Sequence, residues 1–189
     1  MSSKTDQPEK PIKAQKNVQL PLFVGEHIRA WVSGFVDGEG CLRIEKRFRK
    51  HKAKRFIRKQ EYVQYSIRVS VVNKNIEALE RIRLYYGGHI FRHSLDTSKN
   101  WAQTYTYVLC NSKRVKKLLD DIQPYSIVKA GHIRVAKEFI TSTKLNRSEK
   151  TNRIGIGGVG SVGLDDNIIQ LRDNMREKMS ALNKRGRGT

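Results

Sequence analysis

The feature that most constrains the fold is a repeated order in which a helical segment is followed by two segments of alternating polarity. Apolar side chains first recur at steps of three and four residues, the period of an α-helix, at Ile28, Trp31, Val32, Phe35 and Val36. Apolar and polar residues then alternate, as in half-buried strands, in CLRIEKRFRK (41–50) and EYVQYSIRVSVVN (61–73). The apolar sides of these strands are expected to be Leu42, Ile44 and Phe48, and Tyr65, Ile67, Val69 and Val71.

The same order returns farther along the chain. NIEALERIRLYY (75–86) has helical spacing, and a second hairpin is indicated by HIFRHSL (89–95) and WAQTYTYVLC (101–110). Further helical patterns occupy 112–122, about 126–142 and 164–183. The apolar positions of the 126–142 pattern are Ile127, Ile133, Val135, Phe139 and Ile140. This order predicts an α+β fold with a curved antiparallel four-stranded sheet, helices gathered on the other face and an added C-terminal helix.

Glycine and asparagine residues mark the expected helix ends. Asn73 or Asn75 can cap the start of the 75–86 helix, and Gly87-Gly88 ends it. Gly40 is expected to close the first helix in the left-handed conformation.

Three regions are expected along the chain: a flexible basic tail (1–22), a core (23–145), and a glycine-rich linker with the C-terminal helix (146–189). Residues 155–160 match the pattern GxGxxG, but no strand precedes them, so a loop is a better interpretation than a dinucleotide site.

Charge is the strongest global clue to a partner. The 189 residues include 38 Lys and Arg against 18 Asp and Glu, a formal net charge of +20. This excess predicts a polyanionic partner, with nucleic acid favoured over a membrane surface because no basic amphipathic helix has a large apolar face. No apolar run reaches the ~18 residues of a membrane span. Two distant cysteines and the polar N-terminus favour a protein that is not secreted, in a bacterial or archaeal cytoplasm or in a mitochondrion or chloroplast.

The segment WVSGFVDGEG (31–40) combines two unusual features. Asp37 and Glu39 lie at the predicted C-terminal end of a helix, where the helix dipole disfavours carboxylates, and a divalent cation would compensate them. The alternative is an ordinary helix end with solvated surface carboxylates. Ser33, Gly34 and Gly38 are expected to make one side of the helix almost bare of side chain. Gly34 and Gly38, four apart on one face, cost up to about 1 kcal/mol each relative to alanine. Close packing against another helix would offset this cost. If that helix belongs to a second copy, two Glu39 carboxylates converge.

Residues 32–40, VSGFVDGEG, resemble the nine-residue motif of the LAGLIDADG homing endonucleases, with Glu in place of the final Asp. The resemblance extends over roughly residues 25–145 and its αββαββα order, and the motif occurs once. It implies a homodimeric, intron-encoded enzyme that cuts both strands of double-stranded DNA at a long pseudo-palindromic site. It also implies Mg²⁺-dependent phosphodiester hydrolysis, with Mn²⁺ as a substitute and Ca²⁺ as an ion that supports binding without cleavage.

The resemblance also implies roles for individual residues. Glu39 would bind the metal together with the backbone carbonyl of Gly38, and Asp37 would support the turn and the chain that follows. Asn73 would position the nucleophilic water, and Lys129 would polarise solvent or steady developing charge. Two alternatives stay open: Asn73 as a simple helix cap and Lys129 as one phosphate contact among many.

Base contacts are expected from the outward side of the strands, because arginine suits guanine and glutamine suits adenine in the major groove. For any one of them the alternative is a solvated strand face. The candidates are Arg43, Glu45, Arg47, Arg49, Gln64, Ser66, Arg68, Ser70, His89, His93, Thr104 and Thr106. The nine Lys and Arg residues between Lys46 and Lys59 should mostly bind phosphate.

Two other functions compete with the nuclease. The first is an intron maturase that binds RNA with little or no cleavage. The second is a basic binding protein of the ribosomal type, for which Glu39 would have no catalytic importance.

Overall fold

The computed structural model describes residues 24–50, 61–93, 102–151 and 166–185. The predicted N-terminal tail, the basic link at 51–60 and the GxGxxG segment lie outside the described residues. The chain divides into two compact units, Met1–Cys41 with Val69–Ile127, and Leu42–Arg68 with Val128–Thr189, called here the first and second units.

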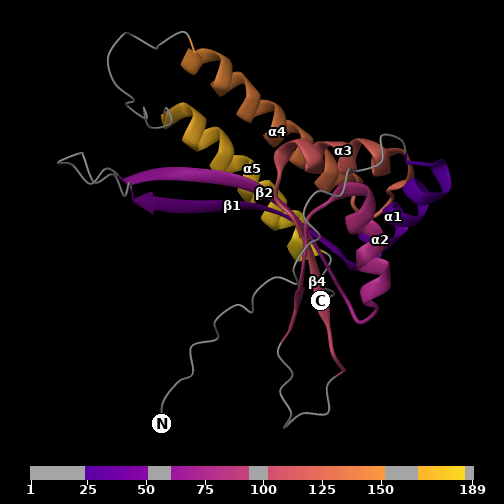
Figure 1. Ribbon diagram of the computed structural model, residues 1–189. Coiled ribbons are helices and arrows are strands. Elements are labelled where there is room, and N and C mark those ends of the chain that lie inside the picture. Colours follow the sequence, from indigo (N-terminus) through magenta and orange to yellow (C-terminus); the bar gives the residue numbers. More distant parts are fainter. Residues whose placement is uncertain (1–23, 51–60, 94–101, 152–165, 186–189) are drawn as a thin grey trace, which may run out of the picture. The chain divides into compact units, whose positions relative to one another are not determined.

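The described elements follow the predicted order (Figure 1). They are α1 (Glu26–Glu39), β1 (Gly40–Lys50), β2 (Glu61–Asn73), α2 (Ile76–Tyr86), β3 (His89–Arg92), β4 (Tyr105–Leu109), α3 (Ser112–Ile122), the short 3₁₀ helix η1 (Gln123–Tyr125), α4 (Ala130–Thr151) and α5 (Asp166–Arg185). The sheet has the strand order β1-β2-β4-β3, and β4 pairs antiparallel with both β2 and β3. The predicted α+β architecture is confirmed.

The first unit has a core of helices against the short strands. Helix α1 contacts α3 and η1, and α2 lies against β3 and β4 (Figure 1). Tyr107 of β4 is fully buried and its hydroxyl donates to the Gly87 carbonyl at 2.8 Å. Burial raises the pKa of this phenol far above its ordinary value, so the group stays protonated as a donor.

The second unit joins β1 and the start of β2 to α4 and α5. Helices α4 and α5 contact each other, and buried side chains come from the strands, from α4 and from α5, at Leu42, Ile67, Phe139 and Met179. The Lys46 ammonium and the Asp173 carboxylate of α5 pair at 2.7 Å. The C-terminal helix is therefore an integral part of this unit's packing.

Two apolar residues predicted to be buried are exposed. Phe48 is 70% exposed and lies near the end of β1, which ends at Lys50. The preceding residue on the same side of the strand is the charged Lys46, whose ammonium lies 5.8 Å from the Phe48 ring. Ile127 is 87% exposed, because α4 begins at Ala130 and not near residue 126.

Two details of the helix ends also differ from expectation. Asn75, and not Asn73, caps α2 by accepting from the backbone N–H groups of Glu77 and Ala78. Gly40 has φ −80°, an extended conformation, so no left-handed residue closes α1. A Cβ at Gly40 would lie 2.3 Å from the Val36 carbonyl oxygen, so close approach is what requires glycine there.

Candidate functional site

The C-terminal end of α1 carries two carboxylates in different surroundings. The Asp37 carboxylate is engaged inside the first unit: Ser126 Oγ donates to Oδ1 at 2.6 Å, and the Ile127 backbone N–H donates to Oδ2 at 2.7 Å. Asp37 thus makes the structural contacts predicted for it, tying the end of α1 to the chain after η1.

Glu39 is the last residue of α1 and is exposed. Across the described residues, no hydrogen bond or ion pair engages its carboxylate, and the last turn of α1 has no basic side chain. The carbonyl of Gly38 belongs to the last turn as well, where helix carbonyls lack partners within the helix. Negative potential therefore accumulates at this end of α1.

These donors fit a hard divalent cation only in part. Carboxylate and carbonyl oxygens are the ligands that Mg²⁺ prefers. However, among the residues that the structure describes, no group of three or more His, Cys, Asp or Glu side chains could hold a metal ion. The remaining ligands would have to come from water, from a phosphate or from a second copy of the chain.

One face of α1 is bare, as predicted. Gly34 and Gly38 are exposed, and a Cβ at either position would meet nothing within 4 Å. Trp31 and Phe35 stack on the same helix with ring centroids 5.5 Å apart, and the Arg81 guanidinium lies 5.9 Å from the Trp31 ring. Ser33 does not join this face, because it is fully buried and its hydroxyl donates to the Ile122 carbonyl.

The other two candidate catalytic residues lie in different units. Asn73 ends β2 opposite Tyr105, and its side-chain oxygen accepts from the Asn75 backbone N–H at 2.8 Å. The side-chain NH₂ group of Asn73 takes no part in this hydrogen bond, and Asn73 belongs to the first unit, as Glu39 does. Lys129 precedes α4 in the second unit, and its carbonyl accepts from the Ile133 backbone N–H at 2.9 Å.

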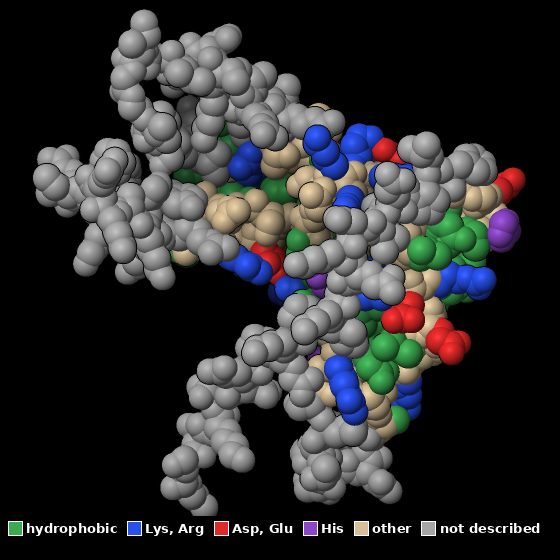
Figure 2. Space-filling model, in the orientation of Figure 1, with side chains coloured by type: hydrophobic (Ala, Val, Ile, Leu, Met, Phe, Trp, Pro, Cys, Tyr) green, Lys and Arg blue, Asp and Glu red, His purple; other side chains and the backbone are tan. Residues whose placement is uncertain are grey.

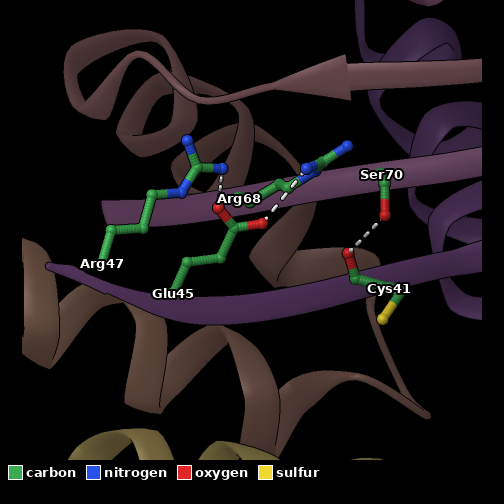
Figure 3. A network of polar contacts seen from close by, with 5 residues as sticks. All are labelled: Cys41, Glu45, Arg47, Arg68 and Ser70. Carbon is green, nitrogen blue, oxygen red and sulfur yellow. Dashed lines mark hydrogen bonds and ion pairs between the residues drawn. The ribbon is translucent and has the colours of Figure 1, made fainter. Parts of the chain in front are cut away.

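The outward sheet positions of the first unit are polar at the predicted places. Ser70 Oγ lies 3.5 Å from the Cys41 carbonyl oxygen, across from β1 (Figure 3). His89 and His93 are exposed, and His93 Nε2 lies 2.5 Å from Thr106 Oγ1. The His93 backbone N–H also donates to the Thr104 carbonyl.

Apolar candidates on this side were missed by reasoning from polar residues alone. The register aligns Val72 of β2 and Phe91 of β3 with Thr106, so all three share the outward side. Val72 is 45% exposed. Alternation along β2 could have placed it outward, and an exposed apolar side chain there suits a thymine methyl group.

The outward positions of the second unit hold a charged cluster. The Glu45 carboxylate lies between Arg47 of its own strand and Arg68 of β2 (Figure 3). Arg43 and Gln64 are exposed and Ser66 is half-buried, while the side chain of Arg49 lies outside the described part of the structure.

Basic side chains are not confined to the strands. Figure 2 shows Lys and Arg side chains at several separate places on the visible face, with fewer Asp and Glu side chains between them. No helix among the described residues has the length and hydropathy that crossing a membrane requires.

Known proteins provide an independent comparison. Among solved structures, the chain is similar to the homing endonuclease I-CvuI in complex with its target (15% identity, 84% of this chain and 96% of that chain, TM-score 0.46). It is also similar to the archaeal intron-encoded homing endonuclease I-Vdi141I complexed with DNA (18%, 82% and 96%, 0.47) and to the meganuclease I-SmaMI bound to uncleaveable DNA (13%, 80% and 44%, 0.51).

No curated protein matches the chain in a sequence search. A family model described as LAGLIDADG endonuclease, however, matches residues 32–153, well over half of the chain and including the segment with Gly38, Glu39 and Asn73. The chain belongs to the LAGLIDADG endonuclease family.

Proposed function

We propose that this protein is a site-specific homing endonuclease, encoded within an intron, that hydrolyses one phosphodiester on each strand of a long, nearly palindromic DNA site. The observation that carries the proposal is the exposed Glu39 carboxylate, which has no partner among the described residues and lies at the end of a glycine-bared helix. Family membership and the net charge of +20 support double-stranded DNA as the substrate.

A divalent cation, Mg²⁺ in this proposal, would be held by the Glu39 carboxylate and the Gly38 carbonyl oxygen. When bound, such an ion stabilises the charge that develops on the phosphate and on the leaving oxygen. In this proposal Ca²⁺ would support DNA binding without cutting. Glutamate is one methylene longer than aspartate and keeps the hard oxygen donor.

The protein's own groups would orient the water and the phosphate. The Asn73 side-chain oxygen already accepts from Asn75, so its amide group would donate to the attacking water from the end of β2. Lys129 would stabilise negative charge near the scissile phosphate as a cation.

A homodimer is needed in this proposal because one chain supplies one Glu39. Gly34 and Gly38 leave space on α1 for close approach of the same helix from a second copy, and the Trp31–Phe35 stack would border that contact. Twofold symmetry then gives each strand of the duplex one catalytic glutamate, and it explains a nearly palindromic target.

The test compares two charge-neutralising variants of one helix. Glu39→Gln is expected to abolish cutting of a target duplex in Mg²⁺ while retaining binding in Ca²⁺. Glu26→Gln changes an exposed carboxylate in the first turn of α1 and is expected to cut like the parent. The target is found by placing the gene's flanking junction in a plasmid.

Three results would contradict the proposal. Cutting by Glu39→Gln at the parental rate would show that this carboxylate is not the metal ligand. Binding of intron RNA by the parent without DNA cleavage would establish a maturase. Loss of cutting in Glu26→Gln to the same degree would indicate a general effect of charge on α1.

A further inference from the structure

Glu45 differs from the other outward strand residues because both of its carboxylate oxygens are already engaged. Arg47 Nη2 donates to Oε2 at 2.5 Å, and Arg68 Nη1 donates to Oε1 at 3.1 Å (Figure 3). Residues 45 and 47 are two apart on β1 and therefore point to the same side, and Arg68 reaches them from β2. The cluster joins two strands of the second unit.

The exposure of the three side chains shows which of them face outward. The Glu45 side chain is 21% exposed, whereas Arg68 is 33% and Arg47 is 52% exposed. The carboxylate is thus the most covered member, and the guanidinium groups extend beyond it. A nucleic acid lying on this side of the sheet would meet the arginines before the glutamate.

Each arginine keeps enough donors for a base. A guanidinium has five N–H donors, and each of these two uses a single nitrogen on Glu45. The remaining donors suffice for the paired contact to O6 and N7 of guanine. A contact from Glu45 itself to a cytosine amino group would instead compete with two charge-assisted hydrogen bonds that are already formed.

We propose that Glu45 is the positioning residue for guanine recognition by the strand pair: its carboxylate aligns Arg47 and Arg68 toward base edges and keeps them from gripping phosphates. The proposal rests on the proposed DNA-cleaving function and adds a role that family membership does not assign. The two arginines together with Glu45 carry less net positive charge than two unpaired arginines would. Because Glu45 already holds their side chains, they also lose less conformational freedom when DNA binds. Released from Glu45, each is an ordinary phosphate contact, which binds any sequence.

The test is selection from a pool of randomised DNA duplexes in Ca²⁺, followed by measurement of base preference at every position. Glu45→Gln is compared with the parent, with Arg47→Ala and with Arg68→Lys. Glu80→Gln is the matched control, because it removes the same charge from an ion pair with Arg83 within α2, and neither residue belongs to β1 or β2.

The expected result is a loss of guanine preference at two positions in each half-site, roughly tenfold at each. One position should coincide with that lost in Arg47→Ala and the other with that lost in Arg68→Lys, which keeps its charge but not its fork. Glu45→Gln should also bind random duplex more tightly, with a salt slope steeper by roughly 0.9 for each phosphate newly contacted. Glu80→Gln should keep the parental preferences.

Several outcomes would overturn the proposal. An unchanged preference profile in Glu45→Gln would make the cluster an ordinary surface ion pair. A change at a single position that neither arginine variant affects would make Glu45 itself the base reader. If the parent selects no sequence at all, the DNA-cleaving function fails, and this result is distinct because it appears before any variant is compared.

Discussion

Replacing Gly34 by alanine should stabilise the single chain and weaken the dimer, two effects of opposite sign. Gly34 lies inside α1, is exposed, and has no φ in the left-handed range. Glycine in a helix interior costs about 0.8–1.0 kcal/mol relative to alanine. Because an added Cβ meets nothing within 4 Å, no clash opposes this gain, and the isolated chain should be more stable by about 1 kcal/mol.

In the proposed dimer the same methyl group enters a contact between two backbones. Overpacking typically costs about 1–3 kcal/mol at each site, and twofold symmetry places the change in both copies. Even the lower end, about 2 kcal/mol for the dimer, weakens association by more than tenfold, since 1.4 kcal/mol corresponds to about a factor of ten. Gly34→Leu should abolish the dimer at micromolar concentration.

Two measurements separate these effects. Urea unfolding at a concentration below the dimer dissociation constant reports the stability of the chain, and sedimentation equilibrium reports association. Gly131→Ala on α4 is the matched control, since its Cβ would meet Leu182 at an ordinary 3.6 Å. This control should leave association unchanged.

The reasoning is refuted if Gly34→Leu sediments as a dimer with parental affinity. The bare face of α1 would then have another role, and the pairing of two Glu39 carboxylates would lose its structural basis. A drop in the stability of the isolated Gly34→Ala chain would refute the other half of the argument, that the position is open in the monomer.

The remaining predictions concern the stability of the fold. Gly40→Ala should destabilise the chain by about 1–3 kcal/mol in urea unfolding, because its Cβ would lie 2.3 Å from the Val36 carbonyl oxygen; parental stability would contradict this close approach. A second prediction concerns the Lys46–Asp173 pair. Burial raises the pKa of Asp173, but hydrogen bonds with Lys46 and Tyr65 outweigh this effect and lower the pKa below 3.8. The hydrogen bond with Asp173 raises the pKa of Lys46 above 10.5. The stabilisation that this pair gives the fold is therefore fully present between these two pH values. It is lost as pH falls through the folded-state pKa of Asp173 or rises through the folded-state pKa of Lys46. Asp173→Asn should flatten both limbs of a thermal-melting pH profile, whereas Glu177→Gln on the same helix should retain them.

Local periodicity was sufficient to predict most of the elements. The α1 and α2 segments, both long strands and α5 occur close to the expected places because each buries one face along most of its length. Periodicity failed near element ends. Phe48 follows the alternation of β1 but is 70% exposed, and Ile127 was assigned to a helix that begins three residues later. An alternating or helical pattern shows which side of an element faces the core, but it does not show how far along the element other segments cover that side.

Contacts between segments far apart in sequence could not be predicted in the same way. The strands at 41–50 and 61–73 showed that Glu45 and Arg68 point outward, but their meeting depends on the pairing register of β1 with β2. Likewise, Ser33 was grouped with the glycines of α1, whereas the packing of α1 on α3 turns it inward toward Ile122. These features depend on tertiary packing, which no single segment encodes.

The two carboxylates of WVSGFVDGEG show how far the electrostatic argument from the sequence extends. Both oppose the dipole of α1, and the sequence predicts compensation for each without saying where it comes from. For Asp37 the chain itself supplies it, through the Ser126 hydroxyl and the Ile127 backbone N–H. For Glu39 the described residues supply none. A carboxylate that accepts two hydrogen bonds from its own chain has its charge compensated there, whereas one left exposed at the negative end of a helix keeps its oxygens available to a cation. This difference in partners supports the two roles that the resemblance to the motif implies, Glu39 as the metal ligand in our proposal and Asp37 as the structural contact.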